Sequence, residues 1–321
     1  MAYTAGSLIE ATDYNGFVST NGSNVNEVWS TGTGDRGYGQ SAVATVSVGG
    51  TVTATQWATL VNTIAAAANH QGTAITARTA PVVGNTIAIL SAVNTDITTL
   101  ETNRLNAVAN GTQFTGWTGT SAKTAATSGA TWTIVFRHDI NFADANSARY
   151  FFNAGGRVKW ECSKTATGQT GDPEWNDLAN TLVGDIYITA GTATQAIAGS
   201  SYTGTTKVGG TGTPNILTTT TGWYDLTTTP VNIYKQFADT APYTANFIQI
   251  AANVNAAIAS ATRLTLTTTW SASDGDPISG GTAPSGATPG TAATTLVTFF
   301  PPSTTYLSAS WGTPGVAATT T

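Results

Sequence analysis

The chain has 321 residues, enough for one large or two ordinary domains with a buried core. Charged residues make up only 9% of it, against roughly 25% in an average soluble domain, and the formal net charge is -5. Because the few lysines and arginines are scattered, phosphate neutralisation cannot drive binding, and we expect no nucleic-acid partner.

Threonine, alanine, serine, asparagine and glycine take the place of the missing charge, and the apolar fraction is 40%. Threonine suits half-buried strands, so this bias favours a β protein whose outer faces pack against other chains. No stretch of about 20 apolar residues occurs, and the first residues lack an export signal. We therefore expect no membrane span, and synthesis and first folding in a cytosol.

Residues 1–50 are rich in small polar residues and predict an extended N-terminal arm. The next segment, 51–110, predicts a two-helix region. Its first helix starts at a capping box, in which Thr53 precedes Gln56 by three residues, and Gly72 supplies the stop. One apolar stripe follows the helical period: Trp57, Leu60, Val61, Ile64 and Ala65. For His70, in the last turn, we expect a cation-tolerant helix end rather than a catalytic role.

A second helix is predicted for about residues 85–105. Leu90, Val93, Ile97 and Leu100 have the a/d spacing of a coiled coil and form a candidate oligomer interface. Only about two heptads are present, so we favour an ordinary two-helix core and keep a trimeric bundle as the alternative.

From residue 111 to 321 the sequence predicts a β-rich domain. Trp132, Ile134, Phe136, His138, Ile140 and Phe142 share one face of a long strand, which makes His138 a core residue. Further strands are expected at 185–189, 231–237, 246–251, 263–270 and 294–299. The expected fold is therefore mainly β, an antiparallel sandwich or jelly roll preceded by a short helical region and the arm.

Residues 148–163 predict strand, tight turn and strand, because Asn153 and two glycines follow an aromatic run. In the second strand Val158, Trp160 and Cys162 would face the core, and the alternate positions from Arg157 to Ser163 would face water. Cys162 is the single cysteine, and we expect it to be buried and inert.

The tail after Pro277 has no charged residue and is rich in threonine, glycine and proline. Chain ends of this composition stay mobile unless something holds them, and we expect neighbouring chains to do so.

Catalytic motifs are not evident in this sequence, and we expect no enzyme activity and no cofactor. Asp274 and Asp276, or the set Asp172, Glu174 and Asp177, could touch a calcium ion, although aspartates in turns are the favoured interpretation. A glycosidase needs only two carboxylates, so that enzyme class stays open.

The segment from Ala148 to Gly156, followed by residues 172–177, resembles a segment of virion structural proteins of tailed bacteriophages. Shorter parts of the chain resemble the same family: Trp29 with Gly32, Gly37-Tyr38-Gly39-Gln40, Gln56-Trp57, His70-Gln71-Gly72, residues 234–246 and Ser273-Asp274-Gly275-Asp276. The resemblance implies a tail fibre or another tail or neck appendage, which acts in assembly or host attachment rather than catalysis. In that family the N-terminal arm would serve virion attachment or subunit contact.

Several alternatives remain. A head decoration or collar protein would share the virion context, as would a polysaccharide depolymerase; a bacterial surface adhesin would share the composition. The partners we expect are further copies of this chain in a homotrimer, other virion proteins and host surface polysaccharide. Sugars bind flat aromatic rings and neutral hydrogen-bonding groups, which makes Trp223, Tyr224, Trp270 and Trp311 candidate receptor contacts, although a core position is favoured for each.

Overall fold

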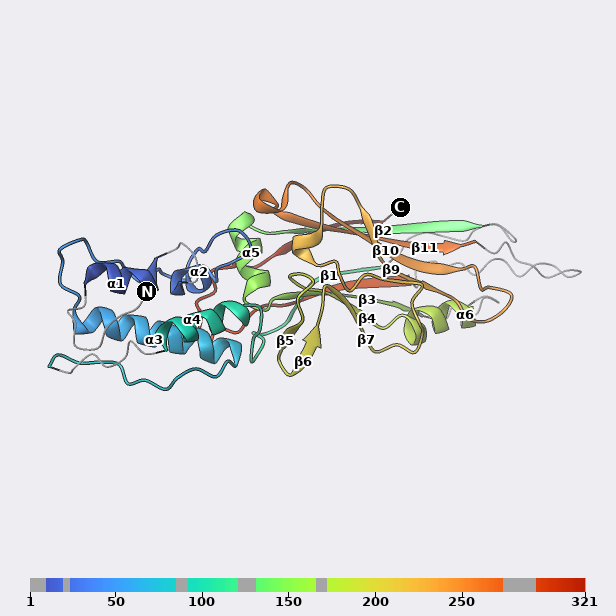
Figure 1. The fold of residues 1–321 in the computed structure, drawn as a ribbon. Helices are drawn as coiled ribbons and strands as arrows, with labels where there is room; N and C mark the ends of the chain where they lie inside the picture. The colour runs from blue at the N-terminus through green and yellow to red at the C-terminus, as the bar shows by residue number, and fades with distance from the viewer. Residues whose placement is uncertain are drawn as a thin grey trace, which may run out of the picture.

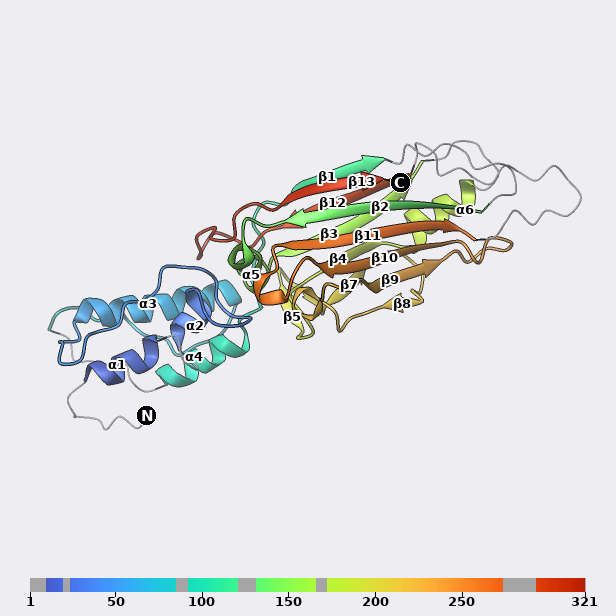
Figure 2. The same ribbon diagram turned by 90° about the horizontal axis from the view of Figure 1, so that it is seen from above.

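The computed structural model describes residues 10–19, 24–84, 92–120, 131–165, 172–273 and 293–320. These residues form an elongated molecule, with a bundle of helices at one end and a β-sandwich at the other (Figures 1 and 2). Helix α5 (Ala145–Asn153) lies where the two parts meet. The architecture is mainly β with antiparallel sheets after a short helical region, which confirms the predicted fold class.

The bundle consists of α1 (Ala11–Val18), α2 (Val25–Trp29), α3 (Ala54–Gln71) and α4 (Val93–Thr102). Helix α3 has the predicted capping box: Thr53 Oγ1 accepts from Gln56 N at 3.3 Å, and Gln56 Oε1 accepts from Thr53 N at 2.8 Å. It ends at Gly72 in the left-handed conformation (φ +68°). Of the second predicted helix, residues 85–91 lie outside the described part. No helix among the described residues is long and apolar enough to cross a membrane.

The expectation of an extended arm over residues 1–50 is wrong for the described part of it, because α1 and α2 pack onto α3. Tyr14 is fully buried, and its ring meets that of Trp57 edge to face at 5.3 Å. The side chain of Asn15 pairs with both backbone groups of Val46 (2.7 and 2.8 Å). A few apolar anchors outweigh a polar composition when they share one face of a helix.

The sandwich contains two antiparallel sheets within the described residues. The first has the order β1-β12-β3-β4-β7 and the second β13-β2-β11-β10-β9-β8. A two-stranded hairpin, β5-β6, stands apart. The strands are β1 (Phe114–Thr120), β2 (Trp132–Asn141), β3 (Arg157–Lys164), β4 (Asp185–Ile188), β5 (Gln195–Ile197), β6 (Ser200–Tyr202), β7 (Thr205–Val208), β8 (Ile216–Leu217), β9 (Val231–Phe237), β10 (Phe247–Val254), β11 (Arg263–Ala272), β12 (Ala293–Phe300) and β13 (Gly315–Thr320). Short helical turns lie at Asp172–Asp177 (α6), Leu178–Leu182, Trp223–Asp225 and Ile258–Ser260.

Strand β2 shows the predicted alternation, with the even-numbered residues from Trp132 to Ile140 buried. His138 is a core residue, as expected, and its Nε2 lies 3.2 Å from Thr295 Oγ1 on β12, so the contact joins the two sheets. The Trp117 ring of β1 meets His138 edge to face at 4.6 Å. The five further predicted strands correspond to β4, β9, β10, β11 and β12.

Residues 148–153 are helical rather than the first strand of a hairpin, so this prediction is wrong. Asp144 caps α5, since its Oδ1 accepts from Ser147 N at 2.7 Å, and the cap lies upstream of the aromatic run on which the prediction rested. Gly155 (φ +90°) then makes the tight turn, and β3 follows as predicted.

Residues 315–320, the last described part of the tail for which we expected neighbouring chains as support, pair with a strand of this chain itself. Strand β13 pairs with β2 in antiparallel register from Gly315 opposite Asn141 to Thr320 opposite Phe136. The tail thus forms one edge of the six-stranded sheet. Its sequence has little apolar alternation, and backbone pairing with β2 and the packing of half-buried Val316 against the core place it.

Trp160 on β3 is fully buried between the two sheets. Trp160→Ala should lower the free energy of unfolding by roughly 3 to 5 kcal/mol, because removal of a buried indole leaves a cavity. Urea unfolding measures this loss. The control Thr118→Ala, at an exposed position of β1, should change it by less than about 0.5 kcal/mol. A Trp160 loss as small as that of the control would contradict the core position.

Candidate functional site

Sequence segments that are far apart meet at the joint between the bundle and the sandwich. The joint consists of the loop at residues 30–40, the last turns of α3 and α4, the end of α5 and residues 308–311. Three of the short sequence motifs described above lie at or next to these segments: Trp29 with Gly32, Gly37-Tyr38-Gly39-Gln40 and His70-Gln71-Gly72. Their side chains hydrogen-bond mainly to backbone groups of the joint, as follows.

Gln40 joins the N-terminal loop to the C-terminal segment across 268 residues of sequence. Its Oε1 accepts from Ser308 N at 2.7 Å, and its Nε2 donates to Ser308 O at 3.0 Å. Ser310 Oγ donates to Tyr38 O at 2.6 Å. The amide therefore satisfies both backbone groups of one residue, as a strand partner would.

Tyr38 and Gln71 connect this loop to the ends of α3 and α4. Tyr38 is fully buried; its hydroxyl donates to Arg104 O at 2.6 Å and accepts from Gln71 Nε2 at 2.8 Å. Gln71 Nε2 also donates to Leu100 O at 3.0 Å. Burial raises the pKa of the Tyr38 phenol above its ordinary value, so the group stays protonated and can donate.

His70 connects α3 to α5. Its Nε2 lies 3.1 Å from Ala154 O, and only 2% of the residue is exposed. Burial lowers its pKa from an ordinary 6.5 to about 4, and the bond to the Ala154 carbonyl offsets this in part. His70 is therefore neutral near pH 7, which corrects the expectation of a cation-tolerant helix end.

Asn153, the last residue of α5, lies between the two parts of the molecule. Its Nδ2 donates to Gly37 O at 3.1 Å, and its Oδ1 accepts from the Tyr224 hydroxyl at 2.8 Å. Gly37 has φ +95°, and a Cβ there would lie 2.2 Å from Thr31 O, so glycine is required. The Asn153-Ala154-Gly155-Gly156 segment is thus part of the joint as well as a turn.

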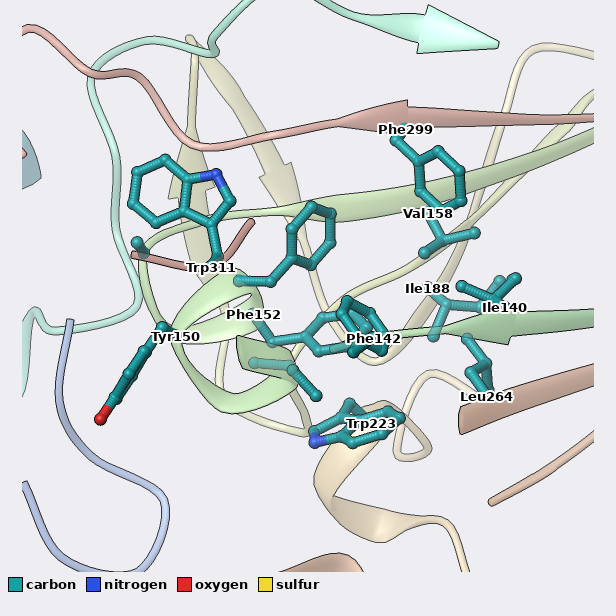
Figure 3. Close-up of a cluster of buried hydrophobic side chains, with 14 of the residues drawn as sticks. Ile140, Phe142, Tyr150, Phe152, Val158, Ile188, Trp223, Leu264, Phe299 and Trp311 are labelled. Atoms are coloured by element: carbon teal, nitrogen blue, oxygen red, sulfur yellow. The ribbon is translucent and has the colours of Figure 1, made fainter. Parts of the chain in front are cut away.

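Aromatic rings fill the sandwich end of the joint (Figure 3). Phe152 stacks on Trp223 with ring centroids 5.0 Å apart, and Phe142 lies 5.7 Å from both. All three side chains are buried. The cluster anchors α5 to the interior of the sandwich, so the helix cannot slide relative to the sheets.

The candidate oligomer interface lies inside the bundle, which corrects that prediction. Val93, Ile97 and Leu100 are buried within the same chain, with at most 1% exposed, and Leu90 lies outside the described residues. The a/d spacing therefore describes the favoured intramolecular helix packing and leaves these three side chains no surface for a second copy.

Three of the four candidate receptor contacts are also core residues. Trp223, Trp270 and Trp311 are buried, and Trp270 stacks on Trp175 with centroids 5.6 Å apart. Tyr224 is half-buried, and its hydroxyl donates a hydrogen bond to Asn153 Oδ1. The three buried tryptophans therefore offer no free ring face to a sugar.

The carboxylates suggested for calcium do not converge in the described part of the chain. There, no group of three histidine, cysteine, aspartate or glutamate side chains could hold a metal ion. Asp274, Asp276 and the side chain of Asp172 lie outside that part. Glu174 is buried, and burial, then Asp239 and Asp177, raise its pKa.

Arg157 is a buried cation that the sequence did not predict, since alternation placed it toward water. It is 2% exposed, and its guanidinium lies 4.6 Å from the Tyr202 ring centroid, 5.1 Å from that of Phe300 and 6.0 Å from that of Tyr187. Hairpin β5-β6 contributes Tyr202 and covers this end of the sheet. Cation–π contacts take the place of a carboxylate here. The three aromatic residues lie on different strands, β4, β6 and β12, so no short stretch of the sequence predicts that they surround this arginine.

Cys162 is half-buried, and its Sγ lies 3.6 Å from Ala179 O. Burial raises the pKa of the thiol above its ordinary value, so the group stays protonated. This is consistent with an inert thiol.

Comparisons with protein-family models, curated proteins and solved structures found no significant match to this chain. The geometry alone therefore describes the site. Its buried polar side chains are neutral and their hydrogen bonds go mostly to backbone carbonyls and amides, an arrangement that holds two parts of a molecule in fixed orientation. Charged groups lie at its more exposed edge, where Arg104 pairs with Asp35 at 2.8 Å and Arg149 donates to Thr31 O at 2.8 Å.

Asn153→Ala should lower the free energy of unfolding by roughly 1 to 3 kcal/mol, because the buried Gly37 carbonyl and the half-buried Tyr224 hydroxyl lose their bonds. Tyr224→Phe removes one of the same bonds, so the double variant should lose less than the two single losses added, by about 1 kcal/mol. Chemical denaturation of the four proteins measures this coupling. Asn94→Ala, at an exposed position of α4, is the control. Strict additivity would contradict the bond between Asn153 and Tyr224.

The free energy of unfolding should decrease as the pH is lowered from about 6.5 to 4. Burial lowers the pKa of both His70 and His138 to about 4, so over this range the unfolded chain binds protons that the folded chain does not. Each histidine contributes roughly 3 kcal/mol at most. His70→Gln, whose amide can donate to the same Ala154 carbonyl, should show a shallower decline in urea unfolding. Equal declines in the wild type and the variant would contradict this explanation.

Proposed function

We propose that this chain is a non-catalytic structural component of a tailed-bacteriophage virion, a tail fibre or another tail or neck appendage that acts in assembly or host attachment. The observation that carries the proposal is the joint. Segments that resemble the phage family, from the loop at residues 30–40 to the end of α5, meet there and hydrogen-bond to backbone groups.

The elongated shape supports the same proposal (Figure 1). An appendage transmits force along its length. The joint resists bending through neutral buried hydrogen bonds together with the ion pairs of Arg36 with Glu101 and of Arg104 with Asp35 at its edge. The scarcity of charge fits a surface that packs against other virion proteins.

We further propose that the chain works as a homo-oligomer, with a trimer as the preferred form. The buried a/d residues of α4 and the paired tail no longer support this part of the proposal. It rests on the neutral, threonine-rich surface alone.

Immunogold labelling and peptide mass spectrometry of purified virions test the proposed function. The expected result is that peptides of this chain are present in stoichiometric amount and that the label lies on the tail or neck. Label on the head would favour the decoration alternative. Absence of the chain from virions, with abundant protein in infected cells, would overturn the proposal.

A further inference from the structure

The outer face of the six-stranded sheet is open. In Figure 2 this face points toward the viewer, and no described helix or hairpin crosses it. The strand register places many hydroxyl and amide side chains on this face. Its neutral polar members are Thr133, Asn141, Asn232, Gln249, Asn253, Thr267, Thr269, Ser271 and Thr319.

The charge of this face differs in sign from that of the whole chain. Three cations, Arg137, Lys235 and Arg263, and one carboxylate, Asp139, give it a net charge of +2, whereas the chain carries -5. Asp139 accepts from Thr265 Oγ1 at 2.7 Å and lies between the two arginines. The arginine side chains are 49% and 36% exposed, so each keeps N–H donors in solvent.

Lys235 is the most informative residue of the face. Its Nζ lies 3.7 Å from the ring centroid of Phe247 and 4.4 Å from that of Phe237, and the two rings meet edge to face. No carboxylate of the described residues pairs with it, and burial lowers its pKa without an opposing charge. The rings hold the ammonium in place while its N–H donors remain free for a ligand.

The spacing of the cations indicates the kind of ligand. Lys235 on β9 and Arg137 on β2 are three strand steps and two residues apart, roughly 16 Å, with hydroxyls and amides between them. A nucleic acid has phosphates far more closely spaced than this, and a protein interface has a more apolar centre. A polysaccharide with widely spaced carboxylates and many hydroxyls matches both the charge and the hydrogen-bonding groups.

We propose that this outer sheet face, with Lys235 as its anchor, binds an acidic polysaccharide. The inference rests on the proposed attachment function and adds to it the class of receptor and the surface that contacts it. The ammonium and the two guanidinium groups bind carboxylates. Thr269, in register with Lys235, binds sugar hydroxyls next to Gln249, whose Nε2 donates to Asn232 Oδ1 at 2.9 Å.

The experiment uses the full chain and defined polymers. Affinity electrophoresis compares hyaluronate, polysialate and carboxymethyl-dextran with neutral dextran of similar length. The expected result is retardation by acidic polymers only, weakened by added salt. Lys235→Met keeps the packing of the side-chain stem and should lower the affinity by about tenfold, the loss expected for a hydrogen bond to a charged group.

The control Lys207→Met removes the same charge from β7, in the other sheet, and should leave binding within about twofold of the wild type. Thermal unfolding of each variant confirms that it is folded. No retardation by any acidic polymer, or equal retardation of the Lys235 and Lys207 variants, overturns the proposal.

A second copy of the chain is the competing occupant of this face. If light scattering shows an oligomer that Lys235→Met or Gln249→Arg dissociates, the face is a subunit contact and the polysaccharide proposal is wrong. If the chain is present in virions but does not bind acidic polysaccharides, only this inference is wrong. Binding by a chain that is absent from virions discards only the proposed function.

Discussion

The fold depends on the pairing of buried backbone groups at the joint between the bundle and the sandwich. An unpaired carbonyl in such a place costs on the order of 1 to 3 kcal/mol, and this joint buries those of Gly37, Leu100 and Ala154. Side chains that can donate without carrying charge satisfy them. Charged donors would pay a larger desolvation cost in the same place, which explains the use of amides, a phenol and a neutral imidazole.

This constraint explains how a chain with so few charges holds two different architectures in one orientation. The aromatic cluster around Phe152 fixes α5 to the sandwich, and Asn153 and Ala154 at the end of the same helix receive the bundle. Apolar packing gives stability without direction, whereas the hydrogen bonds give direction. Helix α5, which has nine residues, combines the apolar packing and the hydrogen bonds at the joint.

The outer sheet face differs from the joint, because its polar side chains lie at the surface, and several of them pair with one another, as Gln249 Nε2 does with Asn232 Oδ1 at 2.9 Å. Thr267 and Thr269 alternate with buried Leu266 and Trp270 on β11, so one strand serves the core and the surface at once. The few cations on this face are held by rings or by a shared carboxylate. A surface of this kind can bind a hydrated, weakly charged ligand with little rearrangement.

The sequence by itself determined the elements whose pattern is local. Alternation over ten residues defined β2, and the caps Thr53 and Gly72 defined α3, because neighbours two to four residues apart decide these structures. The same periodicity identified Val93, Ile97 and Leu100 as one face but could not name the partner that covers it.

Only the tertiary structure decided the features that join distant segments. It made residues 148–153 a helix, placed β13 beside β2 and buried Arg157 under a hairpin. It also placed Gln40 beside Ser308, and it showed that the tryptophans among the candidate receptor contacts are core residues. Such contacts depend on how the chain returns in space, and two residues separated by 268 positions leave no periodicity from which their meeting could be predicted.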